Sequence, residues 1–420
     1  MKRFLRAVSR FILGITFILS GFLKAIDPIG VSLKITEYLN AFYLGFLDFA
    51  SLPAGILLAG AEFIIGVCIL KGIRMQLFSR IALWFVSFFT LLTLYSAIFS
   101  PVKDCGCFGE AIHLSNWETF FKNIILLACS CTVYFQRNQF RPIASARWEN
   151  IYTGCYAFFI LSISAYSLIL LPQVDFGGFK AGTDLSVAFR SEPEMEYETT
   201  FTYSKEGKKQ EFTLNNLPDS TWTFVESHTK LISASSITSG VPDFILKNSN
   251  GEYVTEKIVE SNKPVLLLSV YNVNKIGKKR VEKIMRLRDS ASAAGAVFYI
   301  LSGNAPETTE ERFCNTDTPN THNPFLPEEI LYTDYKTALL LNRSNGGAVY
   351  MNNGTIACKW SRYNYPTDKI TNILKEDSET VTANIIIKEH IFIELSIAFI
   401  LFMILIVRFV SKQIYSSIKK

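Results

Sequence analysis

The chain has 420 residues, a formal net charge of +5 and a hydrophobic content of 49%, and it contains 34 Phe. A mean hydropathy of +0.23 is too high for a single soluble domain, and the length allows two or three domains. The modest charge, with no basic patch interleaved with aromatic residues, argues against nucleic-acid binding. Eight cysteines are too few for a disulfide-dense scaffold.

Six apolar segments are each long enough to cross a bilayer as a helix of about 20 residues. Basic residues cluster before the first segment, at 71–80, at 137–147 and after 407, which places them all on one side if every segment crosses. The positive-inside rule then predicts a bacterial inner (cytoplasmic) membrane protein with both termini cytoplasmic and residues 172–388 periplasmic. No small-residue cleavage site follows the first segment, so we expect an uncleaved span. The six segments run approximately over 9–26, 51–70, 78–99, 118–136, 150–171 and 391–410.

The stretch "SPVKDCGCFGEAIHLSNWETF" interrupts the apolar sequence between the third and fourth spans, on the outer side, where disulfides persist. A disulfide between Cys105 and Cys107 closes a very small ring, which we expect to be strained, oxidising and labile. Gly106 permits the backbone that such a ring needs. Lys103 and the N-terminus of the next helix, capped by Ser115 or Asn116, favour a thiolate there, whereas Asp104 and Glu110 oppose it.

Three interpretations of this pair stay open: a redox-active pair, an inert loop disulfide or two reduced thiols, and a metal site. For a metal, His113 adds one imidazole to two thiolates, which suits copper or zinc. No fourth protein ligand is evident nearby in the sequence, so a metal is the weakest of the three.

Ionisable residues mark two further positions in the predicted bundle. Glu62 lies in the middle of the second span, where a charged group is a functional candidate by default. Its structural interpretation is a partner for a neighbouring helix, and Lys24 and Ser20 are the expected partners. Lys24 and Asp27 in "LKAIDP" are also expected to cap and anchor the first helix at the outer interface.

The outer region becomes polar after Leu171, and 172–240 is predicted to be rich in strands, with a turn at 206–207. A hairpin is expected around Asn250-Gly251, and a buried strand over 265–270. A charged helix over 275–293 and the strand "AVFYILSG" follow, which predicts a βαβ unit with parallel strands. A second hairpin around Asn353-Gly354 and a helical tail over 366–376 complete the region.

The opening "PDFILKNSNGEYVT" and the closing "GGAVYMNNGTIACKW" resemble the hairpins of a thioredoxin-like domain over 241–380. The resemblance implies a CxxC motif after the first central strand, but 271–276 reads Tyr-Asn-Val-Asn-Lys-Ile, and Gly346-Gly347 replaces the family's proline. Without a thiolate there, ordinary thiol exchange cannot run. We therefore predict a degenerate module that binds or positions a partner. Cys314 and Cys358 are compatible with either a disulfide or two separate thiols.

"SGFLKAIDP", "GAEFIIGVCILKG" and "DCGCFGEAI" together resemble the DoxX-like superfamily, specifically the branch of the methylamine-utilisation protein MauE, over about 5–136. The fusion to a large outer domain resembles the longer DoxX-family proteins of Bacteroidetes. The resemblance implies a four-helix bundle and disulfide formation in a periplasmic partner protein. The layout is also similar to bacterial vitamin K epoxide reductase homologues, which join a quinone-reducing bundle to a thioredoxin-like domain.

The predicted fold is therefore a membrane all-α four-helix bundle over 1–140, a linking span over 150–171, a periplasmic β-rich segment and α/β thioredoxin-like domain, and a C-terminal transmembrane helix over 391–410. The leading hypothesis is a thiol–disulfide oxidoreductase in which Cys105 and Cys107 pass electrons from an unknown periplasmic protein to a membrane quinone. The alternative is a non-catalytic membrane scaffold with a structural disulfide. Transport of a small molecule or metal through the bundle, supported by Glu62 alone, is a third hypothesis.

Overall fold

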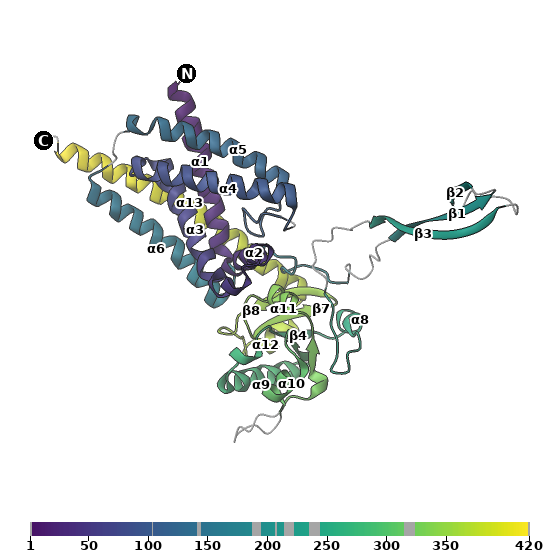
Figure 1. Cartoon of the computed structure of the whole chain (residues 1–420). Coiled ribbons are helices and arrows are strands. Elements are labelled where there is room, and N and C mark those ends of the chain that lie inside the picture. Colours follow the sequence, from purple (N-terminus) through teal and green to yellow (C-terminus); the bar gives the residue numbers. More distant parts are fainter. Residues whose placement is uncertain are drawn as a thin grey trace.

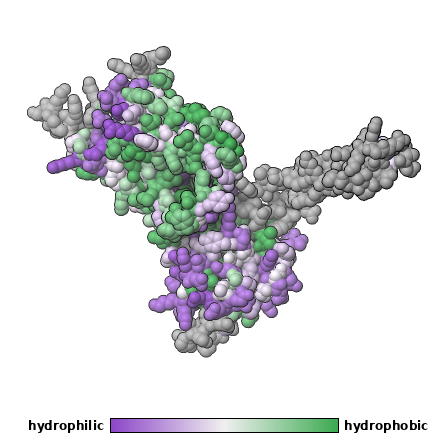
Figure 2. All heavy atoms as spheres, in the orientation of Figure 1, coloured by the Kyte–Doolittle hydropathy of each residue, from purple (hydrophilic) through white to green (hydrophobic). Residues whose placement is uncertain are grey.

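The computed structural model describes residues 2–102, 104–140, 144–186, 195–205, 208–213, 222–234, 244–314 and 324–418. An apolar helical bundle and a polar α/β domain lie against each other, and a separate small sheet is formed by residues between them in the sequence (Figure 1). The surface of the bundle is mostly hydrophobic and that of the α/β domain mostly hydrophilic (Figure 2). This division follows the change in composition at Leu171-Pro172.

Five helical segments of the described chain are long and apolar enough to cross a membrane, which confirms the first five predicted spans and makes this an integral membrane protein. They run over Phe4–Ile26, Gly45–Lys71, Met75–Phe99, Asn116–Phe135 and Ala146–Leu170. The corresponding helices are α1 (Lys2–Ile26), α3 (Ser51–Lys71), α4 (Met75–Phe99), α5 (Asn116–Phe135) and α6 (Ala146–Leu170).

Helix α2 (Pro28–Ala41) occupies the connection between the first two spans, where no helix was predicted. Asp27 is its N-cap, accepting a hydrogen bond from Gly30 N at 2.9 Å, and Pro28 takes the first helical position. The expectation that Asp27 caps the first helix is therefore wrong, because its carboxylate begins the second one.

Helix α13 (Ser378–Ile418) covers the predicted sixth span over 391–410 but is not among the five segments above. It packs along the bundle, with the rings of Phe159 and Phe399 4.9 Å apart and with Phe392 and Ile393 against the bundle core. The sixth membrane crossing stays a prediction.

Helices α1 and α3 approach closely because small residues face each other. A Cβ on Gly21 would lie 2.4 Å from the backbone nitrogen of Phe63, and one on Gly66 would lie 2.6 Å from that of Ile18. Within lipid no hydrophobic force draws helices together, so they associate through close packing. Small residues at the interface allow this packing. The close approach brings the polar side chains of α1 and α3 within hydrogen-bonding distance.

The α/β domain, called the outer domain after its predicted position, is built on a five-stranded sheet in the order β6-β5-β4-β7-β8, in which β4, β5 and β6 are parallel and β7 and β8 antiparallel. The predicted βαβ unit is present, formed by β4 (Val265–Val270), α9 (Lys278–Ala293) and β5 (Val297–Ser302). The helix begins later than predicted because Val273–Lys275 forms a 3-10 turn. The remaining elements are α8 (Thr255–Val259), α10 (Pro306–Phe313), β6 (Ile330–Tyr332), α11 (Tyr335–Leu341), β7 (Gly347–Asn352), β8 (Thr355–Trp360) and α12 (Ile370–Lys375).

The two predicted Asn-Gly hairpins are both present but differ in length. Asn353 and Gly354 both have positive φ, 47° and 78°, as a type I′ turn requires, and they join β7 to β8. Around Asn250-Gly251 the hairpin is short: Lys247 and Tyr253 form one antiparallel bridge, and Asn248 N donates to the carbonyl oxygen of Glu252 at 3.0 Å. The other edge of Lys247 bridges to Tyr332, which joins this hairpin to β6.

The small sheet contains β1 (Met195–Lys205), β2 (Lys208–Thr213) and β3 (Thr223–Ala234) in the order β2-β1-β3, all antiparallel. Strands were predicted here. The predicted turn at 206–207 lies outside the described residues, but the strands on either side of it pair with each other.

Replacing Gly21 with Ala is expected to destabilise the bundle by about 1–3 kcal/mol, because the new Cβ meets the backbone of α3. Gly60→Ala is the matched control on α3, since a Cβ at Gly60 has no heavy atom within 4 Å and Ala favours helix. Thermal unfolding in detergent measures both. Equal midpoints for the two variants would contradict the proposed α1–α3 contact.

Candidate functional site

The Cys-Gly-Cys loop connects α4 to α5 and is fixed at its end by a capping box. Ser115 is the N-cap of α5: its hydroxyl accepts from Glu118 N at 3.3 Å, and its own N–H donates to Glu118 Oε2 at 2.8 Å. Asn116 Nδ2 donates to the carbonyl oxygen of Val102 at 3.0 Å and closes the loop. Lys103 lies outside the described residues.

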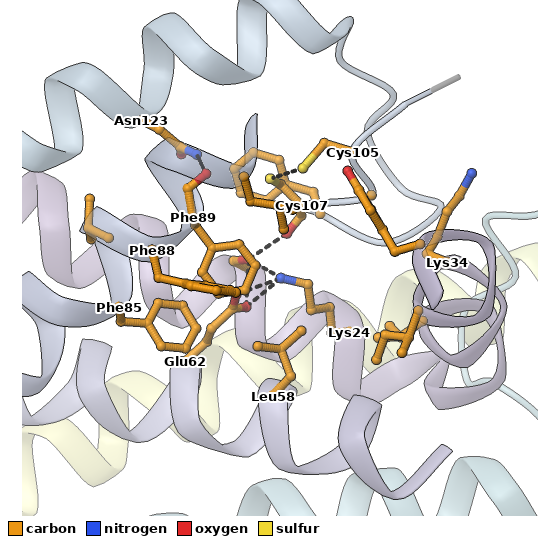
Figure 3. Close-up of a pocket in the computed structure, with 18 of the residues that line it drawn as sticks. Lys24, Lys34, Leu58, Glu62, Phe85, Phe88, Phe89, Cys105, Cys107 and Asn123 are labelled. Carbon is orange, nitrogen blue, oxygen red and sulfur yellow. Dashed lines mark hydrogen bonds and ion pairs between the residues drawn. The ribbon is translucent and has the colours of Figure 1, made fainter. Parts of the chain in front are cut away.

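The two thiols of the loop lie next to each other. Cys105 Sγ and Cys107 Sγ are 3.1 Å apart and both are free (Figure 3). Gly106 between them has φ +64°, and a Cβ there would lie 2.9 Å from Lys34 Cγ. A disulfide has its sulfur atoms about 2.05 Å apart, so it would require a closer approach of the two sulfur atoms and the loss of two electrons to an oxidant.

The two thiols differ in acidity. The hydrogen bond from Cys105 lowers the pKa of Cys107 against the effect of burial, and the nearby charges of Lys122 and Lys24 add to this. The same hydrogen bond, together with burial, raises the pKa of Cys105, which is only 9% exposed. Cys107 is therefore the more acidic thiol of the pair.

A buried ion pair lies directly beneath the loop (Figure 3). Lys24 Nζ lies 2.7 Å from both carboxylate oxygens of Glu62 and 3.0 Å from Ser20 Oγ. Ser20 Oγ is in turn 2.7 Å from Glu62 Oε2 and 2.5 Å from the carbonyl oxygen of Cys107. The expected contacts of Glu62 are thus present. Lys24 is 4% exposed, so the expectation that it anchors α1 at the interface is wrong.

Helix α2 holds the loop from the other side. Lys34 forms an ion pair with Asp104 and lies 3.3 Å from Glu37 Oε2. Asp104 Oδ2 also lies 3.0 Å from His113 Nδ1. Burial tends to raise the pKa of Asp104, but hydrogen bonds from Lys34 and His113 outweigh it and hold the pKa below its usual value.

His113 therefore points to Asp104 rather than to the cysteines. In the part of the chain that the structure describes, no three His, Cys, Asp or Glu side chains group closely enough to hold a metal ion. Glu110 likewise lies against α2: its Cγ would be 3.3 Å from a Cβ on Gly30. The loop's acidic residues thus contact α2 and the imidazole.

A cavity of about 240 Å³ opens beside the thiols, between α1, α2, α3, α4 and α5. Its wall is mostly aromatic and aliphatic, and its polar groups gather at the loop end with Cys105 and Cys107 (Figure 3). Sequence reasoning missed Tyr38 and Lys122, which also line this cavity. The sequence does contain a signal for Lys122, because a charged residue within the predicted fourth span is a functional candidate by default. The apolar wall includes Phe17, Val31, Ile35, Leu39, Phe42, Leu58, Phe85, Val86, Phe88, Phe89, Leu92 and Leu126.

A second buried ion pair joins the outer domain to the bundle. Arg343 Nε and Nη2 lie 3.1 and 2.9 Å from Asp27 Oδ2, and the exposed fractions of Arg343 and Asp27 are 6% and 8%. Arg343 precedes β7, in the loop where the thioredoxin-like resemblance implies a proline. Lys359 on β8 pairs with Asp175 at 2.6 Å, and exposed Lys336 pairs with Glu37 at 2.7 Å.

The outer domain contains two cysteines. Cys314 and Cys358 are both free and pack against the same hydrophobic cluster. The position after β4, where CxxC would stand, is bonded to the loop before β7: Tyr271 Oη donates to the carbonyl oxygen of Arg343 at 3.2 Å, and Asn345 Nδ2 donates to that of Asn272 at 2.7 Å.

The helical bundle is similar to a known protein family. Residues 2–136 match the family model described as Methylamine utilisation protein MauE. Over these residues the chain is similar to the MauE family. The match covers α1 to α5 together with the Cys-Gly-Cys loop, which confirms the resemblance predicted for this part. Residues 197–234, in the small β1–β3 sheet, match a domain of unknown function, DUF8463. No curated protein and no solved structure matches the chain.

Replacing Arg343 with Met is expected to destabilise the protein by about 3–5 kcal/mol, because Asp27 is left as a buried charge without its cation. The matched control Lys336→Met removes an exposed ion pair to Glu37 and should cost less than about 1 kcal/mol. Chemical denaturation of the detergent-solubilised protein measures both. A cost for Arg343→Met no larger than that of the control would show that the Asp27 contact does not hold the domain.

Proposed function

We propose that this protein is a bacterial inner-membrane thiol–disulfide oxidoreductase in which Cys105 and Cys107 cycle between dithiol and disulfide. The observation that carries the proposal is the position of two free thiols, 3.1 Å apart, at the polar end of an apolar cavity within a membrane bundle. A vicinal pair of this kind reacts by thiolate attack, and Cys107 supplies the thiolate.

The reaction has two balanced halves. A partner protein's dithiol reduces the Cys105–Cys107 disulfide through a mixed disulfide, and the partner leaves with a disulfide of its own. The Cys105–Cys107 dithiol then gives two electrons and two protons to an oxidant and reforms its sulfur–sulfur bond. The MauE resemblance implies a periplasmic protein as the partner of the first half.

A membrane quinone fits the second half as the electron-accepting substrate. The cavity wall is lined by aromatic rings, including Phe85, Phe88 and Phe89, which suit a planar apolar ring. Phe42 and Phe88 are also 38% and 61% exposed on the apolar surface of the bundle, so a lipid-soluble molecule can enter from the bilayer. Polar groups at the loop end are available for quinone oxygens.

The membrane arrangement belongs to the same proposal. Six spans, with α13 as the last, keep the basic clusters on the cytoplasmic side and place the Cys-Gly-Cys loop and the outer domain in the periplasm. The strand order β5-β4-β7-β8, with a helix between parallel β4 and β5, supports a thioredoxin-like origin for the outer domain. Since 271–276 contains no cysteine, we assign this domain to partner binding rather than to thiol exchange.

The alternative is a non-catalytic scaffold whose cysteines only close the loop. The burial of Cys105, which is 9% exposed, favours this alternative because an attacking thiol must be reached. The two functions predict different behaviour when one cysteine is removed.

In intact cells, thiol trapping of the Cys105→Ser and Cys107→Ser variants should show a mixed disulfide with a partner in one of the two variants, because the variant has no second thiol to displace the partner. Cys155→Ser, which removes an exposed thiol on α6, is the control and should trap nothing. The redox function fails if neither variant traps a partner and the double variant keeps full activity of its pathway. Co-purification of a stoichiometric partner independent of both cysteines would then support the scaffold.

A further inference from the structure

Lys122 differs from the other lysines of the cavity. Lys24 is paired with Glu62, and Lys34 is paired with Asp104 and Glu37. Among the residues that the structure describes, no carboxylate forms an ion pair with Lys122. Its Nζ lies instead 4.5 Å from the ring centroid of Phe108, which directly follows Cys107.

Lys122 places a partly buried cation beside the two thiols. It is the seventh residue of α5, in a span that is apolar enough to cross the membrane, and its side chain lines the same apolar cavity as Cys105 and Cys107. A cation within a span is a functional candidate by default, and a cation–π contact with one ring replaces only part of its hydration. The arrangement favours an electron-rich group as its partner.

We propose that Lys122 is a catalytic residue that donates a hydrogen bond to a carbonyl oxygen of the quinone in the cavity and holds Cys107 as a thiolate. This inference rests on the proposed redox function. Lys24 is less suited to the first task, because its three N–H groups are directed at the two oxygens of Glu62 and at Ser20 Oγ.

The step balances with the residues present. Cys105 and Cys107 form a sulfur–sulfur bond and lose two electrons, and the quinone becomes a quinol by gaining those electrons and two protons. Because Cys107 reacts as the thiolate, the thiol of Cys105 releases one of the two protons. The ammonium of Lys122 gives the second proton to the quinone oxygen, and Lys122 is reprotonated from solvent after the quinol leaves. No further oxidant or reductant is needed.

The acidity of Cys107 is the first measurable consequence. Removing the Lys122 charge should raise the pKa of Cys107, so that thiolate appears only at higher pH. Other charged or titratable groups on the elements that pack around Cys107 also affect its pKa, and they are kept unchanged when wild type and the Lys122 variants are compared. They are Cys105 and Asp104 in the loop, Lys24 on α1, Lys34 and Tyr38 on α2, and Glu62 on α3.

The test compares Lys122→Gln, Lys122→Arg and the control Arg80→Gln, which removes an exposed cation near the start of α4. Alkylation of Cys107 in the reduced protein is followed against pH by peptide mass spectrometry. Quinol formation is followed against the concentration of ubiquinone-1. Lys122→Gln should move the alkylation midpoint upward by about one pH unit and lower kcat/KM about tenfold, whereas Lys122→Arg should keep most of both. Arg80→Gln should match the wild type.

An unchanged alkylation midpoint in Lys122→Gln overturns the assignment of Lys122 to the thiolate, and an unchanged kcat/KM overturns its contact with the quinone. The failure of the underlying redox function looks different. In that case the wild type forms no quinol from ubiquinone-1, while the shift of the alkylation midpoint between wild type and Lys122→Gln is still measurable.

Discussion

The ion pair between Lys24 and Glu62 is the contact on which the candidate site depends. Both side chains are buried in an apolar bundle, where an unpaired charge costs several kcal/mol, so each requires the other. They meet because Gly21 and Gly66 let α1 and α3 approach closely. Ser20 extends the pair to the carbonyl oxygen of Cys107, so the geometry of the bundle interior fixes the position of the thiol loop.

Helix α2 connects the thiol loop to the outer domain. Its N-cap, Asp27, forms an ion pair with Arg343 of the outer domain. Its Lys34 forms an ion pair with Asp104, and the Lys34 side chain packs against Gly106. A movement of the outer domain relative to the bundle would therefore shift α2 and, through α2, the loop that carries the two cysteines. This arrangement gives a physical reason for joining a domain without a thiol pair of its own to a bundle that has one.

Much of this architecture follows from the sequence alone. Five spans, the βαβ unit and the hairpin at Asn353 and Gly354 follow from local hydropathy and turn chemistry, and the partners of Glu62 follow from the cost of a charge in lipid. The cavity and the contact between Arg343 and Asp27 could not be predicted, because they arise from tertiary packing and from segments more than 300 residues apart. Helix α2 was missed although Asp27 followed by Pro28 is a local start signal for a helix. The hairpin around Asn250-Gly251 also follows from local turn chemistry, although it is limited to one bridge.

The most direct test of the central claim is an anaerobic single turnover of the fully reduced wild-type protein with excess ubiquinone-1. Quinol is counted by absorbance, and the remaining thiols are mapped by mass spectrometry. The account predicts one quinol per protein molecule, with Cys105 and Cys107 joined in a disulfide and Cys314 and Cys358 still reduced. Thiols that remain reduced at Cys105 and Cys107, with no quinol formed, would contradict it.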